Sequence, residues 1–395
     1  MDLSKSVPCP ILPSIEFPVQ QPNPTMSQSS RRILSLDGGG LRGVFTLQVL
    51  AKIEQLMREG RKKPGLVLAD EFDLIAGTST GAIIATLLAW GLAVRDIEKL
   101  YIEQSEGMFA QAALLERWKN KYTPANITAF FRKFFSEDGE GLVPSTLGTK
   151  KLKTLILLVM RNASTGSAWP VTNNPDAMFN DPKLTNCNLQ VPLWQLVRAS
   201  TAAPTFFPPE RITFGEDPFW FLDGGITPYN NPALIAFLTA TLPGYRLNWK
   251  TGVDLLRIIS VGTGNSRVRL AAEKAANFNL LDAAKYVIPA LIHSVSADQD
   301  LLCRALGHCE FGAPIDMEVG DLIGESDGLG PRADRKFSYV RYDHRFTKDE
   351  EDEMRLVGRS DSIGMDNLLI VRPLIKFGKK YAEIVRPEHL GLPVS

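Results

Sequence analysis

The chain has 395 residues, and its 44 lysines and arginines balance its 44 aspartates and glutamates, so the formal net charge is zero. This balance argues against a nucleic-acid polymer as the main ligand, because proteins that bind one usually carry a basic face. Hydrophobic residues make up 44% of the chain, as in an ordinary globular protein. The longest strongly apolar stretches, 82–90 and 154–160, are far shorter than the ~20 residues of a membrane-spanning helix.

We expect three parts along the chain. Residues 1–30 are rich in proline, serine and glutamine without hydrophobic periodicity, which predicts a flexible arm. This arm lacks the apolar segment of a secretory signal, which favours a cytoplasmic location. Residues 31–240 are expected to form a catalytic domain. Residues 241–395 are expected to complete its sheet and to add a helical extension, a candidate regulatory region.

Short apolar runs alternate with helical patterns along the ordered part. Apolar residues at spacings of three and four predict a helix over 44–57, and the stretch 82–90 is apolar on nearly all sides, as in a buried helix. A terminal helix is expected over 367–385. Strands are expected at 33–36, 72–76, 154–160, 219–222 and 255–261. The alternation predicts an α/β fold with a mainly parallel central sheet and helices on both faces.

The first chemical motif is Gly77-Thr78-Ser79-Thr80-Gly81, which fits the pattern G-x-S-x-G. Its place between an expected strand and an expected helix is typical of a nucleophile elbow, where small residues allow a sharp turn. The serine hydroxyl then projects at a helix N-terminus, where the helix dipole favours negative charge. Ser79 is therefore the candidate nucleophile. The alternative is a structural turn with serine and threonine as capping residues.

A second glycine-rich loop, Gly38-Gly39-Gly40-Leu41-Arg42-Gly43, follows the expected strand 33–36. It matches G-x-G-x-x-G, so a nucleotide-binding protein is one alternative. The acidic residue that such folds place about 20 positions later, at the end of a second strand, is absent. The other use of this loop is an oxyanion hole, since amides without side chains can approach a carbonyl oxygen. When the loop is considered together with the candidate nucleophile Ser79, we favour the oxyanion hole. Arg42 adds a positive charge there or pairs with a carboxylate.

A third motif, Asp223-Gly224-Gly225, ends the strand 219–222 and supplies either a turn or a catalytic carboxylate. The four histidines come later, at positions 293, 308, 344 and 389. A hydrolase triad with the histidine last keeps His293 or His308 as a formal candidate. Neither follows an obvious strand in a small-residue loop. A Ser79–Asp223 dyad needs no histidine, because the carboxylate accepts the serine proton.

The three motifs together resemble the patatin-like phospholipase family in order and spacing. The segment from Ala199 to Pro208, Ala-Ser-Thr-Ala-Ala-Pro-Thr-Phe-Phe-Pro, is similar to the block before that family's catalytic aspartate. The resemblance covers about 32–236. It implies a three-layer α/β/α fold, a Ser–Asp dyad without metal or cofactor, and hydrolysis of acyl esters of phospholipids or related lipids at a membrane surface. The site residues it implies are catalytic Ser79 and Asp223, oxyanion or substrate-binding Gly38, Gly39, Gly40, Arg42, Gly43 and Thr80, and the motif glycines Gly77, Gly81, Gly224 and Gly225.

The same resemblance suggests a second hypothesis. Some bacterial patatin-like proteins of similar size serve antiviral defence and become active only when a cyclic nucleotide or a partner arrives. The alternative function is therefore a gated phospholipase effector, with its sensor in the C-terminal 130 residues.

Overall fold

The computed structural model describes residues 30–110, 124–204, 207–215, 217–266, 280–315, 320–321, 331–358 and 368–393. The arm expected at 1–30 lies outside these ranges except for its last residue. No helix within the described ranges has both the length and the apolar character needed to cross a membrane.

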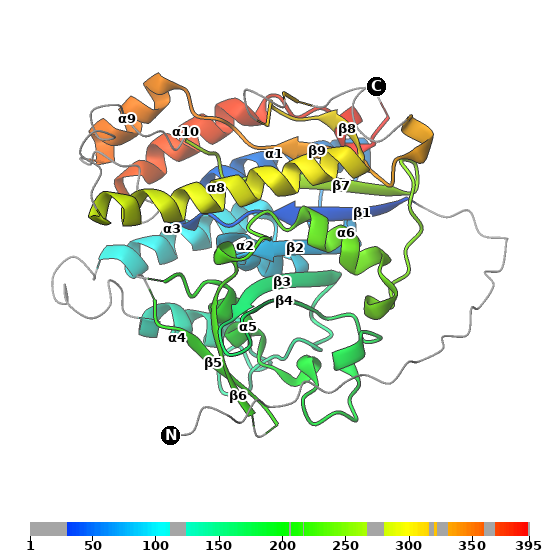
Figure 1. Cartoon of the computed structure of the whole chain (residues 1–395), viewed down its shortest axis with the longest axis vertical. Coiled ribbons are helices and arrows are strands. Elements are labelled where there is room, and N and C mark those ends of the chain that lie inside the picture. The colour runs from blue at the N-terminus through cyan, green and yellow to red at the C-terminus, as the bar shows by residue number, and fades with distance from the viewer. Residues whose placement is uncertain are drawn as a thin grey trace.

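The described residues form a nine-stranded mixed sheet at the centre of the molecule (Figure 1). The strands are β1 (Arg31–Leu36), β2 (Leu74–Thr78), β3 (Leu155–Asn162), β4 (Ser167–Thr172), β5 (Glu210–Phe214), β6 (Asp217–Asp223), β7 (Leu256–Val261), β8 (His308–Phe311) and β9 (Ser338–Tyr342). Their spatial order is β5-β6-β3-β2-β1-β7-β9-β8, and β4 pairs with β3. The run from β3 to β8 is parallel, whereas β4, β5 and β6 join by antiparallel pairing.

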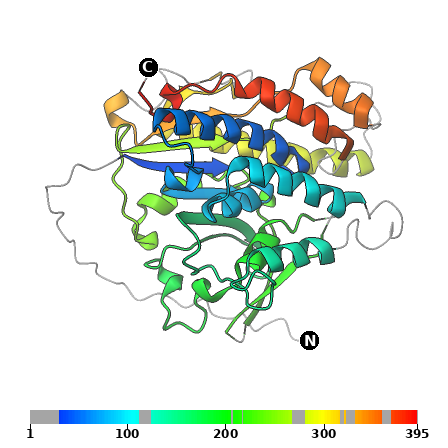
Figure 2. The same cartoon turned by 180° about the vertical axis from the view of Figure 1, so that it is seen from behind.

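Helices cover both faces of this sheet. The helices are α1 (Gly43–Gly60), α2 (Thr80–Ala89), α3 (Val94–Ala110), α4 (Pro124–Phe134), α5 (Leu193–Ser200), α6 (Ala233–Thr241), α8 (Leu280–Leu306), α9 (Lys348–Gly358) and α10 (Val371–Ala382). Figure 1 shows α6 and α8 in front of the sheet, and Figure 2 shows α1 and α10 on the opposite face. The expected α/β fold with helices on both faces of a mainly parallel sheet is confirmed.

Alternation along the strands produces two hydrophobic cores. In β1, Leu34 and Leu36 pack with α1 and α2, whereas Ile33 belongs to the core under α6. Such alternation follows from the two-residue period of a strand, and it makes nearly every position of a central strand apolar. This is why the short apolar runs in the sequence predicted β1, β2, β3 and β7 to within two residues at each end.

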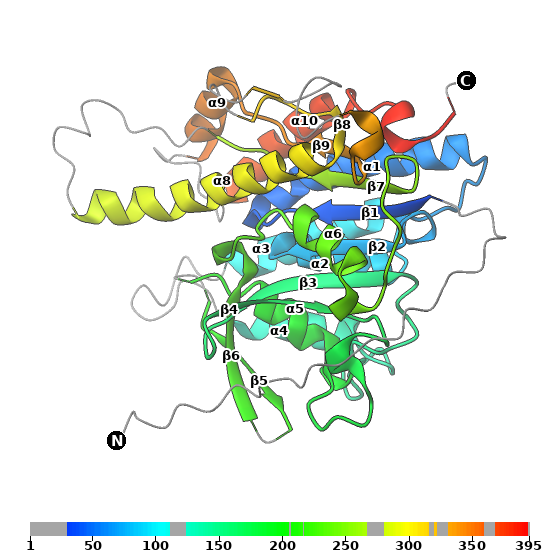
Figure 3. The same ribbon diagram turned by 45° about the vertical axis from the view of Figure 1, so that its right-hand side comes forward.

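Two features differ from the expectation. The strand that ends at Asp223 runs antiparallel to β3, and it forms with β5 a hairpin that extends from one edge of the sheet (Figure 3). Residues 241–395, expected to complete the sheet and to add a helical extension, contain two strands that were not predicted, β8 and β9, which extend the sheet beyond β7. These strands escaped detection because they are only four and five residues long and carry Glu310 and Arg341.

Candidate active site

The chain turns sharply at Ser79, between β2 and α2. Ser79 has φ 54° and ψ −122°, a conformation that few non-glycine residues adopt. The turn depends on close backbone contacts, because a Cβ atom on Gly77 would collide with the carbonyl of Gly81, and one on Gly81 would collide with the carbonyl of Leu36. Both motif glycines therefore allow the strand and the helix to approach closely enough to raise the Ser79 hydroxyl at the helix N-terminus.

The hydroxyl of Ser79 donates a hydrogen bond to Asp223 Oδ2 at 2.6 Å. Strand pairing explains this approach: Thr78 of β2 lies opposite Val159 of β3, and the next residue of β3, Met160, lies opposite Asp223. Although β6 is antiparallel, it overlaps β3 only at the end where β3 finishes. Its last residue therefore reaches the same edge of the sheet as Ser79.

The side chain of Ser79 makes no capping bond to α2, which argues against the capping interpretation. Its backbone amide donates instead to Ser200 Oγ at 3.0 Å, and that hydroxyl donates to the carbonyl of Val159 at 2.6 Å. Asp223 Oδ1 accepts a 2.6 Å bond from the amide of Gly225. A Cβ atom on Gly224 would collide with the Val159 carbonyl, so this glycine also serves a close approach.

Asp223 is buried, with 5% of its surface exposed. Burial raises the pKa of Asp223 from 3.8 to about 6, and hydrogen bonds from Ser79 and Gly225 oppose this shift. The shift follows from the cost of holding a charge where water is excluded. A carboxylate with a pKa near 6 is still ionised at neutral pH, yet it is a stronger base than an exposed aspartate.

The glycine-rich loop 38–43 lies beside Ser79, since a Cβ atom on Gly38 would be 3.1 Å from the Ser79 Cβ. The amide of Gly38 is occupied, because it donates to the Asn230 carbonyl at 3.1 Å. Within the described part of the chain, the amides of Gly39 and Gly40 have no acceptor. Gly40 has φ 58°, a left-handed conformation that suits glycine. The two unoccupied amides are thus the loop's available donors.

The remaining predicted residues hold the loop against the start of α2. The Arg42 side chain folds back, and its Nε donates to the Gly39 carbonyl at 3.5 Å. The hydroxyl of Tyr101 in α3 donates to the Gly40 carbonyl at 2.5 Å and lies 2.5 Å from Thr80 Oγ1. A Cβ atom on Gly43 would lie 2.7 Å from that threonine oxygen, which leaves no room for a larger residue.

No histidine joins the hydrogen bonds that the described residues make to Ser79 Oγ or to the Asp223 carboxylate. His344 pairs with Glu350 at 2.8 Å, and His389 pairs with the hydroxyl of Tyr342 at 2.8 Å. The described ranges also hold no group of three or more histidines, cysteines and acidic residues placed to bind a metal.

Sequence reasoning missed three residues that organise the site: Ser200, Asn230 and Tyr101. Ser200 lies within the segment 199–208, so its position was indicated but its bond to the Ser79 amide was not. Asn230 and Tyr101 carried no signal, because polar residues in a loop and on an amphipathic helix are usually ordinary surface positions.

Comparison with known proteins gives the same family that the three motifs resemble. Residues 34–237 match the family model described as Patatin-like phospholipase. A protein of Vibrio cholerae named cGAMP-activated phospholipase is 32% identical over 209 residues, which are 52% of this chain and 56% of that protein. An Escherichia coli protein named cUMP-AMP-activated phospholipase is 31% identical over 59% of this chain and 64% of its own length. Patatin-like protein 1 of Arabidopsis thaliana is 29% identical over 67% of this chain and 66% of its own length. The chain thus spans little more than half the length of the first of these relatives.

The buried carboxylate at Asp223 generates a stability prediction. The pKa of Asp223 in the folded protein exceeds its value in the unfolded chain. The contribution of this carboxyl group to the free energy of unfolding is therefore fully present below about pH 4 and is lost as the pH rises through 6. Asp223→Asn, which carries no charge, should therefore be more stable than the wild type at pH 7–8, by on the order of 3 kcal/mol. The difference should shrink toward pH 4. Urea unfolding across this pH range measures it.

The matched control is Asp254→Asn, at an aspartate whose side chain is 92% exposed. It should change stability little at any pH. A difference between Asp223→Asn and the wild type that does not vary with pH would contradict the prediction.

Proposed function

The chain belongs to the patatin-like phospholipase family, and from this premise we propose that it hydrolyses fatty-acyl esters of phospholipids or related lipids through Ser79 and Asp223. The observation that carries the proposal is the 2.6 Å hydrogen bond from the Ser79 hydroxyl to the buried Asp223 carboxylate. A nucleophile within reach of a base of raised pKa, at a helix N-terminus, suits acyl transfer. The nucleotide-binding alternative loses its basis, because the matched segment 34–237 includes the 38–43 loop.

The proposed reaction has two halves. Ser79 Oγ attacks the acyl carbonyl while its proton passes to Asp223 Oδ2. Asp223 then gives this proton to the leaving alcohol, and an acyl-enzyme remains. In the second half a water molecule transfers a proton to Asp223 and attacks the acyl-enzyme, which releases the fatty acid and returns the proton to Ser79.

The negative charge on the carbonyl oxygen needs donors that are already in place. We assign this role to the amides of Gly39, Gly40 and Thr80, each without an acceptor in the described residues. The Gly38 amide is not included, because its bond to the Asn230 carbonyl occupies it. Gly38 instead contributes by allowing the loop to lie against Ser79.

We place this reaction on the cytoplasmic surface of a membrane, where a lipid substrate presents its esters. The absence of a spanning helix in the described ranges is compatible with peripheral contact. The proposed partners are the lipid and the membrane surface, with no nucleic-acid polymer.

Ser79→Ala should abolish hydrolysis, since no nucleophile remains, while the fold should persist because alanine fits a turn already built from small residues. The measurement is release of free fatty acids from a panel of phospholipid, galactolipid and neutral-lipid vesicles by mass spectrometry. A fluorophosphonate probe should label the wild type at Ser79. Turnover retained in Ser79→Ala, or labelling at another serine, would overturn the assignment.

The acid side of the pH profile should report Asp223. Because the carboxylate must be ionised to accept the serine proton, kcat/KM should rise through about pH 6 and level off above it. An imidazole could produce a similar limb, so histidine variants are needed as controls. His293→Gln, His308→Gln, His344→Gln and His389→Gln should each keep turnover within about tenfold, a barrier change of ~1.4 kcal/mol, and should leave the limb in place. Loss of acyl-enzyme formation in one folded variant would replace the dyad with a triad.

We also infer that a cyclic nucleotide activates the enzyme. The support is that two relatives at 32% and 31% identity carry names that describe activation by cGAMP and by cUMP-AMP. The initial rate of the purified wild type should increase at least tenfold with one cyclic dinucleotide of a panel, and linear dinucleotides of the same bases should have no effect. Equal rates with and without every cyclic nucleotide would reject activation but leave the hydrolase proposal intact.

A further inference from the structure

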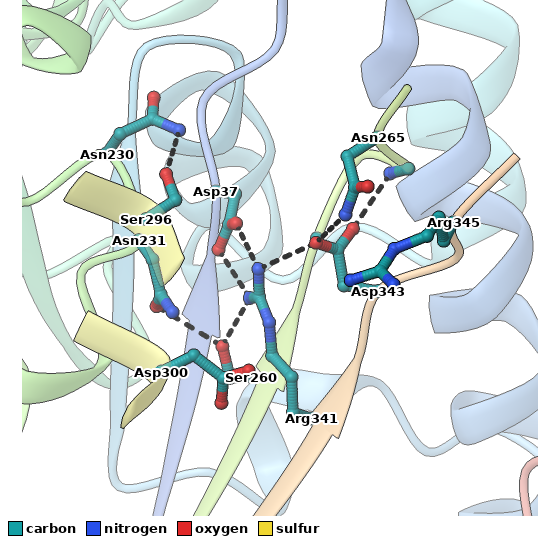
Figure 4. A network of polar contacts seen from close by, with 12 residues as sticks. Asp37, Asn230, Asn231, Ser260, Asn265, Ser296, Asp300, Arg341, Asp343 and Arg345 are labelled. Atoms are coloured by element: carbon teal, nitrogen blue, oxygen red, sulfur yellow. Dashed lines mark hydrogen bonds and ion pairs between the residues drawn. The ribbon is translucent and has the colours of Figure 1, made fainter. Parts of the chain in front are cut away.

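The glycine-rich loop is anchored by a buried ion pair from the far part of the chain. Arg341 of β9 donates to both carboxylate oxygens of Asp37, the residue directly before Gly38, at 2.8 and 2.6 Å (Figure 4). The side chains of Arg341 and Asp37 are only 4% and 6% exposed. Arg341 lies outside the family-matched segment 34–237. It also has no place in the proposed reaction.

The sheet explains how Arg341 reaches this loop. Arg341 lies opposite Ser260 of β7, and Ser260 lies opposite Ser35 of β1. Asp37 directly follows the last residue of β1 and lies two residues beyond Ser35, so its side chain points to the same side of the sheet as that of Ser35. Because both intervening residues are serines, the long arginine side chain can lie across β7 to the end of β1.

All four terminal N–H groups of Arg341 have acceptors. Nη1 donates to Asp37 and to Ser260 Oγ at 2.7 Å, and Nη2 donates to Asp37 and to Asp343 Oδ2 at 3.1 Å. Asp343 in turn accepts a 3.1 Å bond from the Gly264 amide. A planar guanidinium matches this arrangement, whereas a lysine ammonium cannot bridge the two carboxylate oxygens in the same way.

Asp37 is thereby held on two sides. Its amide donates to the Val261 carbonyl of β7 at 3.1 Å, and its two carboxylate oxygens accept hydrogen bonds from Arg341. The following residue, Gly38, is held by Asn230. Gly39 and Gly40, whose amides are unoccupied, directly follow these two anchored residues. The direction of both amides therefore depends on the position of Asp37.

We propose that Arg341 is a positioning residue for the reaction, which acts through Asp37 to aim the Gly39 and Gly40 amides at the acyl oxygen. A buried ion pair gives little net stability compared with apolar residues of similar size, so its presence next to these amides points to a role in geometry. The inference rests on the proposed hydrolase function.

The central test is Arg341→Lys, which keeps the positive charge beside Asp37 but loses the pair of hydrogen bonds to its two carboxylate oxygens. Displacing the loop by a fraction of an ångström should lower kcat about 10- to 100-fold and change KM by less than threefold. The loss should persist at pH 8, well above the pKa values of about 6 to which burial raises Asp37 and Asp223. A loss confined to pH values near 6 would mean that Arg341 acts on the protonation of a carboxylate, and would overturn the proposal.

Two ligands distinguish a loss of oxyanion stabilisation from a general loss of lipid binding. A trifluoromethyl ketone lipid analogue forms a tetrahedral adduct with serine and needs the oxyanion donors, whereas a non-hydrolysable ether lipid mimics only the bound substrate. In Arg341→Lys the affinity for the ketone should fall by the same factor as kcat/KM. The affinity for the ether lipid should remain within threefold of the wild type.

The matched control is Arg257→Lys. Arg257 forms a two-oxygen pair with Glu310, at 2.6 and 3.2 Å, at the opposite end of the same sheet. Arg257→Lys should lower the melting temperature and leave kcat unchanged. An equal loss of kcat in both variants would show a general effect of losing an ion pair and would reject the proposal.

Ser260→Ala keeps the test decisive if Arg341→Lys does not fold. It removes one hydroxyl, which accepts from Arg341 Nη1 and donates to Asn231 Oδ1 at 3.3 Å, and it should lower kcat several-fold without preventing folding. A wild type without hydrolysis or phosphonate labelling, with or without cyclic nucleotides, would reject the proposed function itself. An active wild type, with Ser260→Ala and any folded Arg341→Lys equally active, would reject the positioning role alone.

Discussion

The arrangement of the site depends on one backbone constraint, the turn at Ser79. A serine with φ 54° is unfavourable in isolation, and the structure holds it through backbone contacts that only glycine allows on either side. The same contacts bring α2 against the end of β1, so the glycine loop that follows β1 lies next to the serine. One local strain therefore determines the distance between the candidate nucleophile and the amides that would serve it.

A second constraint is the burial of Asp223. An aspartate in water is too weak a base to draw a proton from serine, whereas exclusion of water raises its proton affinity. The cost of this burial is limited by two donors, Ser79 and Gly225. Asp37 presents the contrasting case. It is equally buried and its pKa is also raised to about 6, but Arg341 donates to both of its carboxylate oxygens, so it is suited to holding a position rather than to accepting the serine proton.

The central strands and the three motifs could be placed from sequence because their signals are local. Apolar runs mark strands that are buried on both faces, and Gly77 and Gly81 mark a turn whose geometry depends on neighbouring residues. The direction of β6 could not be read, since a short strand has the same pattern in either direction. The bond from Ser79 to Asp223 joins residues 144 positions apart, and motif order alone indicated it. Arg341 gave no signal, because a single arginine in a five-residue strand reads as a surface residue until its partner is known.

The position of β1 in the sheet has a consequence for synthesis. Asp37 and its partner Arg341 are 304 residues apart, and β7 pairs with β1 along all six of its residues. A nascent chain that has emerged only as far as residue 237 therefore contains every matched motif, yet one edge of β1 is unpaired and Asp37 has no counter-charge. An unpaired strand edge can pair with other chains, so the incomplete chain is prone to aggregation until β7 has been made. The order of strands thus delays completion of the glycine loop, and with it of the candidate site, until nearly the whole chain has been made.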